Sequence, residues 1–422
     1  MRFPFMSRAA MTALATVLAC GLAAAPAKAE PTVEVLHFWT SGGESKAAGA
    51  LRQDFEAAGG KWIDAPVAGG GGDAASTVLR SRVLAGDAPN AVQLKGPNIK
   101  DWAEQGQLAS LDEVAKAEGW EKTLPPLILD VVKQDGRFVA VPVNIHRVNW
   151  LWINPKVFEK AGLTAPKTWD EFNAAAEKLK AAGVVPLAHG GQPWQDATLF
   201  ENVVLGLGGA DFFRKALVEL DEEALTGETM VKVFDQMRKL RGYVDAGFSN
   251  REWNRAAAML MNGEAGMQIM GDWAKGELLA AGKVPGKDFL CAPMPGQSGF
   301  ILNSDSFVMF KSDNADRKAG QMLLAKLILG PKFQETFNTL KGSIPARQDM
   351  PRDKFDECAV KSMDDLKTAV SANSLVPSMA HEMAVPGAVR GAFLDVVTSH
   401  FNSDMTSKEA VQKLAEAVEL AK

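Results

Sequence analysis

The stretch LHFWTSGGESKAAGALRQDF, residues 36–55, begins as an apolar strand, turns at two glycines and continues as a helix with apolar positions on one face. Its turn carries an indole, two hydroxyls and a carboxylate, from Trp39, Thr40, Ser41 and Glu44. Structure alone can explain them, because an indole fits a strand end, hydroxyl residues fit turns and caps, and a carboxylate suits the first helical turn. The alternative is that these side chains face a ligand.

Strand and helix patterns alternate through the residues that follow. We expect strands at 33–38 and 90–94, helices at 44–58 and 76–86, and a glycine-rich break at Gly69–Gly72. Alternation of this kind predicts an α/β sheet whose functional loops follow the carboxyl ends of its strands. The residues after the two strands, Trp39–Glu44 and Lys95–Pro97, are therefore candidates for a site.

A second region begins near residue 139, where apolar and polar positions alternate through several tryptophans. The segment after it has the spacing of a helix capping box at Thr168 and Glu171, with Gly183 at its end. A strand near residue 269 ends close to Asp272 and Trp273, and a second capping box at Thr406 and Glu409 starts a helix that we expect to dock on the protein.

The first thirty residues have the three parts of a secretory signal peptide. Arginines flank its start, an uncharged apolar centre follows, and Ala27–Ala29 form a small-x-small exit. We expect cleavage after Ala29, a signal peptide at 1–29, and a periplasmic mature chain that starts at Glu30. The alternative is a lipidated Cys20, which Leu18 disfavours because lipoprotein cleavage boxes usually carry a small residue there.

Length and charge narrow the classes of function. A chain of 422 residues exceeds what one hydrophobic core usually holds, so two lobes are expected. With a net charge of -5 and no basic stripe, the chain suits neither nucleic acid nor an anionic membrane surface. Ten tryptophans against one tyrosine lean toward a ligand with flat apolar faces, although core packing accounts for most of them.

Most motifs of enzyme chemistry are missing. The glycine run at 69–72 lacks the lysine and hydroxyl of a phosphate loop, and we expect a mobile loop there. The five histidines have no metal-ligand spacing, and no GxSxG elbow is present, so we expect no metal and no cofactor. A glycosidase stays open as an alternative, since its two carboxylates need no fixed spacing and Glu44, Asp272 and Asp305 are available.

Two cysteines remain after the signal peptide, Cys291 and Cys358. In an oxidising compartment an even pair is a candidate disulfide. The alternative is two buried free thiols.

Several segments in fixed order are similar to one known family. The chain resembles the carbohydrate branch of the extracellular solute-binding proteins of bacterial ABC importers, most closely the periplasmic glucose-binding proteins. The resemblance extends over the mature chain and is carried by FWTSGGE, AVQLKGPNIKDWAEQGQLASLDE, VPVNIHRVNWLWINPKVFEKAGL, PKTWDEF, GDWAKGE, LNSDSF and KGSIPAR.

This resemblance implies a two-lobe periplasmic binding protein fold of type II-like topology. Each lobe would be a mostly parallel sheet flanked by helices, with the ligand in the cleft between them. The N-terminal lobe would comprise 30–142 plus 294–340, and the C-terminal lobe 143–293 plus 341–422. Three hinge crossings near 142, 293 and 341 would join the lobes.

It also implies a function and a set of binding residues. The expected function is capture of a glucose-like monosaccharide by hinge closure and delivery to the permease subunits of an ABC transporter, by a monomer that is not an enzyme. The first lobe would offer Trp39, Glu44, Lys95, Asn303 and Asp305, and the second Gln192, Trp194, Trp273, Lys341 and His381, with Asn144 and His146 as further candidates. Phe38 stands where close relatives carry a second tryptophan.

The chemistry of a pyranose agrees with these residue types. Its apolar C–H face suits flat rings, and its hydroxyls each donate and accept hydrogen bonds. Glu44 and Asp305 are expected to accept, and Lys95, Asn303 and His381 to donate. Hydrogen bonds to charged groups contribute about 1.5 to 3 kcal/mol each, against about 0.5 to 1.5 kcal/mol for neutral ones, which explains carboxylates around a neutral ligand.

Overall fold

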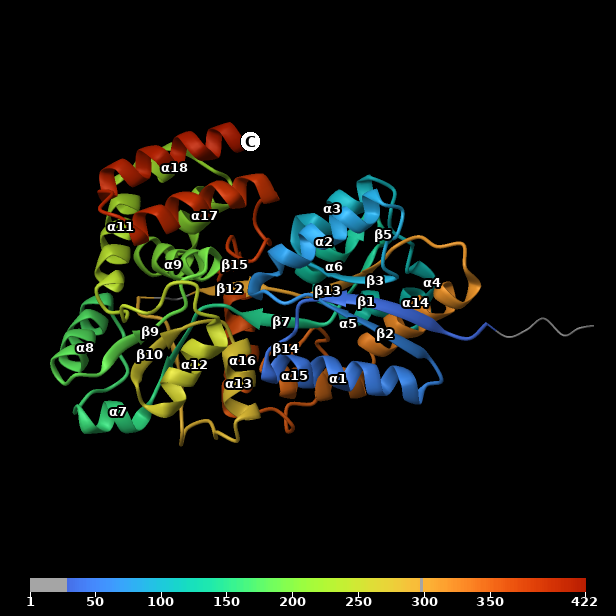
Figure 1. Cartoon of the computed structure of the whole chain (residues 1–422), viewed down its shortest axis with the longest axis horizontal. Helices are drawn as coiled ribbons and strands as arrows, with labels where there is room; N and C mark the ends of the chain where they lie inside the picture. The colour runs from blue at the N-terminus through green and yellow to red at the C-terminus, as the bar shows by residue number, and fades with distance from the viewer. Residues whose placement is uncertain (1–28, 297–298) are drawn as a thin grey trace, which may run out of the picture.

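The computed structural model describes residues 29–296 and 299–422. The expected signal peptide, apart from Ala29, lies outside the described residues, and so does Cys20. The described chain forms two bodies that lie side by side, with strands passing between them (Figure 1). We call the body that contains β1 the first body and the one that contains β10 the second body.

The first body is built on a five-stranded sheet. Strand β1 pairs in parallel with β2 and β3, and β13 pairs antiparallel with β3 and β6. The order across the sheet is β2 (Lys61–Pro66), β1 (Thr32–His37), β3 (Ala91–Leu94), β13 (Ser306–Met309), β6 (Ala140–Pro142).

Short helices and one small hairpin surround this sheet (Figure 1). They are α1 (Gly42–Ala57), the 3₁₀ turn η1 (Gly70–Gly72), α2 (Asp73–Leu84), α3 (Gly96–Glu104), α4 (Asp112–Ala117), α5 (Trp120–Thr123), α6 (Pro126–Val132), the hairpin β4 (Lys133–Gln134) and β5 (Arg137–Phe138), α14 (Ala315–Ile328) and α15 (Pro331–Lys341).

The second body holds a four-stranded sheet and a larger set of helices. Strand β8 pairs antiparallel with β11 and β10, and β10 pairs in parallel with β9. The strands are β11 (Leu290–Pro293), β8 (Trp150–Ile153), β10 (Ala265–Ile269) and β9 (Val185–Ala188). The helices are α7 (Pro155–Lys160), α8 (Trp169–Ala181), α9 (Pro193–Leu217), α10 (Glu222–Thr226), α11 (Glu228–Arg241), α12 (Trp253–Asn262), α13 (Trp273–Ala280), α17 (Gly387–Asn402) and α18 (Ser407–Ala421).

A third sheet lies where the chain passes between the bodies. It comprises β14 (Ile344–Pro345), β7 (Asn144–Arg147), β12 (Phe300–Asn303) and β15 (Leu375–Pro377), and α16 (Glu357–Ser371) packs beside it. Strands β6 and β7 are separated only by Val143, and β12 and β13 only by Ser304 and Asp305. The two neighbouring connections therefore cross as a hydrogen-bonded pair, with the Val143 amide donating to the Asp305 carbonyl at 2.8 Å.

The expectation of mostly parallel sheets is wrong in one respect, since both main sheets are mixed. Parallel neighbours arise where a helix crosses back over the sheet, as between β1, β2 and β3. The antiparallel pairings belong to strands beside the crossings, namely β6 and β13 in one body and β8 and β11 in the other. The chain enters β8 and β13 from the crossing strands β7 and β12 and leaves β6 and β11 toward them, so no helical crossover fixes the direction of these strands.

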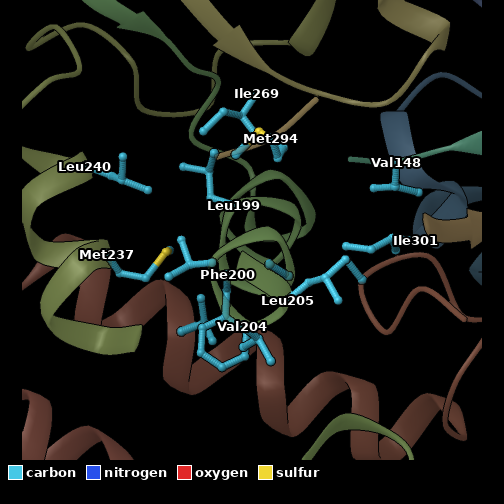
Figure 2. Close-up of a cluster of buried hydrophobic side chains, with 14 of the residues drawn as sticks. Val148, Leu199, Phe200, Val204, Leu205, Met237, Leu240, Ile269, Met294 and Ile301 are labelled. Atoms are coloured by element: carbon cyan, nitrogen blue, oxygen red, sulfur yellow. The ribbon is translucent and has the colours of Figure 1, made fainter. Parts of the chain in front are cut away.

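Each body has its own hydrophobic core. The first core gathers side chains of β1, β3, β6 and β13 with α1, α14 and α15, and the second gathers β8 and β10 with α8, α9, α11, α17 and α18. Figure 2 shows side chains of α9 meeting those of α11 within the second core. This separation supports the division into two lobes, whose boundaries at 142, 293 and 340 remain a proposal.

Local capping agrees with the sequence fully at one predicted site and in part at the other. Thr406 and Glu409 form the full capping box at the start of α18. Thr168 accepts from the Glu171 amide at the start of α8, but the Glu171 carboxylate reaches the amide of Lys167 instead of that of Thr168. Gly183 follows α8 with a positive φ of 75°, as a helix end of this kind requires.

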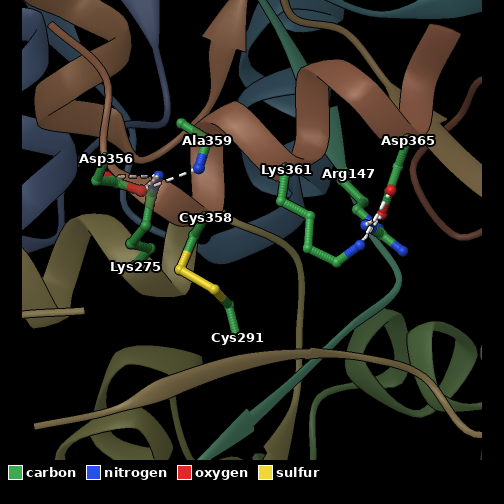
Figure 3. Close-up of a disulfide and its surroundings, with 8 residues drawn as sticks. All are labelled: Arg147, Lys275, Cys291, Asp356, Cys358, Ala359, Lys361 and Asp365. Atoms are coloured by element: carbon green, nitrogen blue, oxygen red, sulfur yellow. Dashed lines mark hydrogen bonds and ion pairs between the residues drawn. A yellow bond between two sulfur atoms is a disulfide. The ribbon is translucent and has the colours of Figure 1, made fainter. Parts of the chain in front are cut away.

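Helix α16 contacts both bodies. Ala359 and Ala369 belong to the first core, while Cys358 belongs to the second and is disulfide-bonded to Cys291 of β11. Around this bond, Lys275 pairs with Asp356 at 2.8 Å and Asp365 pairs with Arg147 (Figure 3). The disulfide and the Lys275 pair hold α16 against the second body, and the Arg147 pair holds it against β7 of the third sheet.

We expect reduction of this disulfide to destabilise the protein. The bond joins residues 67 positions apart, for which the chain-entropy model gives about 3 to 5 kcal/mol. The double variant Cys291→Ser, Cys358→Ser should lose stability of that order in urea unfolding. Thiol titration of the denatured, unreduced mature protein should find no free thiol, and two titratable thiols would contradict the bond.

Candidate functional site

Nine of the ten predicted binding residues line one cavity between the two bodies. The cavity encloses at most about 360 Å³ of space not filled by atoms. Its predicted lining residues come from loops and element ends: Trp39, Glu44, Lys95, Trp194, Trp273, Asn303, Asp305, Lys341 and His381. All nine side chains are buried, so the site is shielded from solvent.

Local sequence explains why these side chains meet. Trp39 follows β1 and Glu44 lies in the first turn of α1, while Lys95 follows β3, the parallel neighbour of β1. Parallel strands end at the same edge of a sheet, so their loops open on one side. Trp194 and Trp273 lie in the first turns of α9 and α13, which begin at the facing edge of the second body.

Aromatic rings form much of the cavity wall. Three rings form a cluster, in which the Trp273 centroid lies 6.4 Å from that of Trp194 and 4.9 Å from that of His381, and the latter two are 5.8 Å apart. Trp39 packs edge-on against Phe307 at 5.6 Å and against Phe337 at 5.0 Å, which fixes its ring in the first body. The wall can therefore present flat apolar surface without further movement of its rings.

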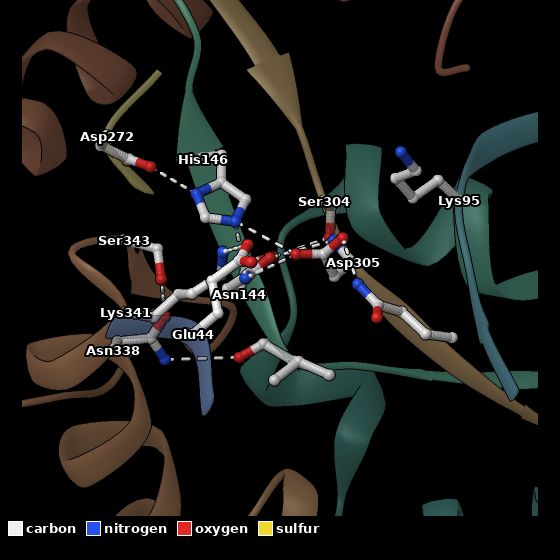
Figure 4. A network of polar contacts seen from close by, with 12 residues as sticks. Glu44, Lys95, Asn144, His146, Asp272, Ser304, Asp305, Asn338, Lys341 and Ser343 are labelled. Atoms are coloured by element: carbon white, nitrogen blue, oxygen red, sulfur yellow. Dashed lines mark hydrogen bonds and ion pairs between the residues drawn. The ribbon is translucent and has the colours of Figure 1, made fainter. Parts of the chain in front are cut away.

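A network of buried polar groups lies at the crossing strands (Figure 4). The Asp305 carboxylate accepts from Gln93 Nε2 at 3.0 Å, from Asn144 Nδ2 at 3.0 Å and from His146 Nε2 at 3.1 Å. The other ring nitrogen of His146 contacts Asp272, which also accepts from the Arg147 amide at 2.9 Å. One imidazole thus bridges a carboxylate from each side of the cavity.

Charge explains the protonation of this network. Burial by itself would lower the pKa of His146, but Asp272 and Asp305 outweigh it and raise the pKa above its ordinary value. Burial would raise the pKa of Asp305, yet the hydrogen bond and charge of His146, with Lys341 and Lys95, hold it well below its usual range. His146, with its raised pKa, therefore lies between the carboxylates of Asp272 and Asp305.

The remaining charged side chains of the wall are paired within the protein. Lys341 Nζ lies 2.6 Å from Glu44 Oε1, and Ser41 Oγ lies 3.0 Å from Glu44 Oε2. Lys95 Nζ donates to the Gly71 carbonyl at 2.8 Å and lies 3.5 Å from Glu382. Sequence reasoning placed Lys341 in the second lobe, but it ends α15, whose apolar side chains pack in the first core.

Three buried polar atoms of the wall have no hydrogen-bond partner among the described residues. They are Trp39 Nε1, a donor, Asn303 Oδ1, an acceptor, and His381 Nε2, which can take either role. A buried polar atom without a partner costs about 1 to 3 kcal/mol, so such atoms in one cavity indicate a polar ligand. The wall thus offers a donor, an acceptor and a ring nitrogen to whatever enters.

Gln192 is the predicted residue that does not line the cavity. Its side-chain oxygen Oε1 accepts from Trp194 Nε1 at 3.0 Å and from Gln195 Nε2 at 2.9 Å, and its side-chain nitrogen Nε2 donates to Glu252. It precedes α9, so its side chain turns toward the helix start and orients the Trp194 ring. A direct role in binding remains a prediction for this residue.

Sequence reasoning did not assign Phe38, Trp253, Gly70 and Gly71 to the wall. The two glycines lie under the Trp194 ring, where an added Cβ at Gly70 would come within 2.9 Å of it. Gly71 also has a φ of 83°, which side chains rarely adopt. The glycine run that we expected as a mobile loop is thus the base on which Trp194 lies, and four glycines in a row were its only signal.

Two searches of the described residues for other chemistry gave nothing. Within 29–296 and 299–422, no three histidine, cysteine, aspartate or glutamate side chains are grouped to hold a metal ion. Nor does that part of the chain contain a helix with the length and apolar character to cross a membrane.

Comparison with known proteins assigns the family. The profile described as "Bacterial extracellular solute-binding protein" matches residues 40–316. A protein of Brucella melitensis described as "Probable sugar-binding periplasmic protein" is 52% identical over 416 residues, 98% of each chain. One of Rhizobium meliloti with the same description is 51% identical over 419 residues, 99% of each chain.

Solved structures show the same fold at lower identity. The bacterial solute receptor AcbH, described as having an exclusive preference for β-D-galactopyranose, superimposes with a TM-score of 0.79 at 19% identity, covering 93% of this chain and 99% of that one. Maltose-bound MalE3 of T. maritima gives a TM-score of 0.75 at 18% identity, covering 92% and 99%. At such identities the likeness supports the fold alone, which is the periplasmic binding protein fold.

The chain belongs to the bacterial extracellular solute-binding protein family. The protein is periplasmic, as its relatives are. Because the members of this family are transport components that bind a solute without transforming it, the glycosidase alternative is excluded.

The raised pKa of His146 predicts how its removal changes stability with pH. A group whose pKa rises on folding stabilises the protein fully below its unfolded pKa of 6.5, and this contribution fades as pH rises through the folded pKa. His146→Gln should therefore cost most near pH 6, on the order of 3 to 5 kcal/mol for a broken buried ion pair, and less at pH 9.

Urea unfolding at pH 6, 7.5 and 9 measures this difference. His400→Gln is the control. Burial lowers the pKa of His400 to about 4, so above pH 7.5 the His400 side chain is neutral in both the folded and the unfolded protein. Its cost should stay constant from pH 7.5 to 9. A cost of His146→Gln that grows with pH would contradict a protonated bridge.

Proposed function

We propose that this periplasmic protein is the sugar-binding component of an ABC importer and that its ligand is a monosaccharide, glucose or a close epimer. The proposal has support from relatives across the whole chain that are described as probable sugar-binding periplasmic proteins. A relative of Pyrococcus horikoshii, 34% identical over 389 residues, is described as an ABC transporter extracellular-binding protein. We propose that the protein works as a monomer and passes its sugar to the permease subunits.

The observation that carries the proposal is the set of unpartnered atoms among aromatic rings. A pyranose ring has an apolar face of C–H groups and a rim of hydroxyls that both donate and accept. Trp39 Nε1, Asn303 Oδ1 and His381 Nε2 need such partners, and the rings of Trp194 and Trp273 offer flat surface. One small polyhydroxylated ring meets both requirements together.

The carboxylate of Asp305 supports a neutral polyhydroxylated ligand. A carboxylate has about four acceptor positions, and Gln93, Asn144 and His146 fill three of them. The position left, on Oδ1, suits one hydroxyl donor. An anionic ligand would be repelled by Asp305 and Glu44, whereas a hydroxyl gains a charge-assisted bond.

Enclosure of the cavity favours a small ligand such as a single sugar ring. An oligosaccharide would require an open end, but every predicted lining side chain is buried. The choice between glucose and its epimers depends on single hydroxyl directions and is left to experiment.

We infer that the described arrangement is the closed form of the protein. The Glu277 carboxylate of α13 accepts from Ser41 Oγ at 2.7 Å and from the Gly43 amide at 2.6 Å, across the two bodies. Arg390 of α17 reaches Asp73 at the start of α2 at 2.7 Å. Rotation about the crossing strands would separate these pairs, so they belong to the closed state.

The first test is a thermal-shift and calorimetric screen of monosaccharides, followed by Asp305→Asn with the sugar that binds best. The variant should bind about 10- to 150-fold more weakly, because a charge-assisted acceptor is lost. Glu159→Gln, an exposed carboxylate-to-amide change, is the matched control and should bind as the wild type does. If no sugar stabilises the protein, the proposed function is wrong; binding within threefold by a folded Asp305→Asn variant would remove Asp305 from the site.

A second test addresses closure through Glu277, which touches no part of the cavity wall. Glu277→Gln should weaken sugar binding about tenfold or more, because the closed form loses a charge-assisted contact with the start of α1. Titration calorimetry measures the affinity, and X-ray scattering should show the radius of gyration of the wild type falling when sugar is added. Glu416→Gln, exposed on α18, is the control. An unchanged radius on binding would contradict hinge closure.

A further inference from the structure

Behind the cavity, a buried carboxylate is connected to the ligand-facing histidine. Ser378 Oγ lies 2.7 Å from Glu201 Oε1 and 2.8 Å from His381 Nδ1, and it also accepts from the His381 amide at 3.1 Å. Glu201 Oε2 accepts from the amides of Met379 and Ala380 at 2.8 and 3.1 Å. Glu201 and Ser378 are fully buried, and neither lines the cavity.

The hydrogen bonds of Ser378 connect Glu201 to His381. A serine hydroxyl has one proton and two lone pairs. The His381 amide occupies one lone pair, so the second lone pair and the proton serve Glu201 and His381 Nδ1. When Glu201 is ionised it must receive the hydroxyl proton, and Ser378 can then only accept from an N–H on His381 Nδ1.

We propose that Glu201, acting through Ser378, is a positioning residue that holds the His381 ring with its proton on Nδ1, so that Nε2 faces the sugar as an acceptor. The Nε2 atom is buried and has no partner among the described residues. Sequence reasoning expected His381 to donate to the ligand, and the accounting at Ser378 reverses this role. The ligand must then present a hydroxyl that donates to His381, which makes Glu201 a determinant of specificity.

Charged neighbours keep the imidazole neutral. Burial, together with the charges of Lys95, Arg390 and His146, holds the pKa of His381 well below its usual range, against the opposing charge of Asp305 and of the Glu201 carboxylate, which lies 3.6 Å from Nδ1. A doubly protonated ring is therefore excluded near neutral pH. The remaining question is which of the two nitrogens carries the single proton.

Protonation of Glu201 would reverse the direction of the hydrogen bonds between Glu201, Ser378 and His381. Burial raises the pKa of Glu201 to about 7, against the hydrogen bonds from Ser378, Ala380 and Met379 and the charge of Arg390. A protonated Oε1 would donate a hydrogen bond to Ser378 Oγ, and the Ser378 hydroxyl would then donate to His381 Nδ1. Nδ1 must accept in that arrangement, so the single ring proton would lie on Nε2. Nε2 becomes a donor after a net uptake of one proton, so tautomers are compared well above pH 7.

The chain of contacts belongs to one body. Glu201 lies on α9, and Ser378 and His381 follow β15, where Met379 and Ala380 pack in the second core. Opening of the cleft would leave these contacts unchanged. The tautomer can therefore be measured in the free protein, independently of the proposed sugar binding on which the specificity argument rests.

Nitrogen-15 NMR of ring-labelled histidine distinguishes a protonated from a bare ring nitrogen. At pH 8.5, the wild type should show His381 with a bare Nε2, its signals assigned by their absence in His381→Gln. Glu201→Gln should move the proton to Nε2, because the glutamine oxygen takes the two backbone amides and its NH₂ donates to Ser378. Asp196→Asn, a buried carboxylate on the same helix that pairs with His189, should leave the His381 tautomer unchanged.

A wild-type His381 with its proton on Nε2 at pH 8.5 would overturn the proposal, even if Glu201→Gln failed to fold. So would a wild-type tautomer retained in a folded Glu201→Gln variant. Ser378→Ala removes the connecting hydroxyl and should give a mixture of His381 tautomers. A single His381 tautomer in this variant would contradict the connection through Ser378.

Monofluorinated deoxy-glucoses test the consequence for recognition, because fluorine cannot donate a hydrogen bond. In the wild type at pH 8.5, the analogue changed at the hydroxyl that faces His381 should bind about 5- to 100-fold more weakly than glucose. In Glu201→Gln the same analogue should bind within about threefold of glucose. If none of these sugars binds while the tautomers are as expected, the proposed function is wrong but the role of Glu201 in placing the His381 proton stands. If the analogue loses the same affinity relative to glucose in the wild type and in Glu201→Gln, Glu201 does not determine specificity.

Discussion

The contact of His146 with Asp272 and Asp305 is the constraint on which the rest of the site depends. The imidazole comes from one crossing strand, and Asp305 follows the neighbouring one. Asp272 lies at the start of α13 in the second body. Removing any member would leave a buried charge without its partner, which costs about 3 to 5 kcal/mol. The two connections between the bodies are therefore held at one fixed register, with binding residues at their ends.

At this fixed register, charged side chains around the cavity lie beside partners of opposite charge. His146 balances part of the charge of Asp272 and Asp305, Lys341 balances Glu44, and Lys95 lies near Glu382. Pairing orients each charged group and leaves few of its hydrogen-bonding positions unused. A neutral ligand then meets directional partners in place of a strong net field, which suits discrimination among sugars by the direction of single hydroxyls.

The two bodies contribute in different ways. Much of the first body's contribution is charged, through Glu44, Lys95, Lys341 and Asp305, whereas the second supplies the rings of Trp194, Trp253, Trp273 and His381. Within the second body, Gln192 holds Trp194 and Ser378 holds His381, and the glycines of η1 in the first body pack against the Trp194 ring. The Glu277 carboxylate of α13 also accepts a hydrogen bond from the Gly43 amide at the start of α1, which joins the two bodies outside the cavity wall.

The sequence by itself determined the features that depend on neighbours in the chain. The strand, glycine turn and helix at 33–57, the capping box at Thr406 and the loops after β1 and β3 follow from periodicity and side-chain chemistry. The rule that parallel strands end at one edge predicts that Trp39, Glu44 and Lys95 lie together. Resemblance to a family supplied the partners from the second half of the chain.

Only the tertiary structure decided which atoms remain free. The direction of strands beside the crossings, the turn of Gln192 toward α9 and the place of Lys341 in the first body depend on packing across the bodies, which local pattern does not encode. Glu201 sits in an apolar helix 177 residues from Ser378, so no spacing in the sequence connects them. Whether His381 accepts or donates depends on where one proton lies, and long-range contacts that bury three polar groups together set that position.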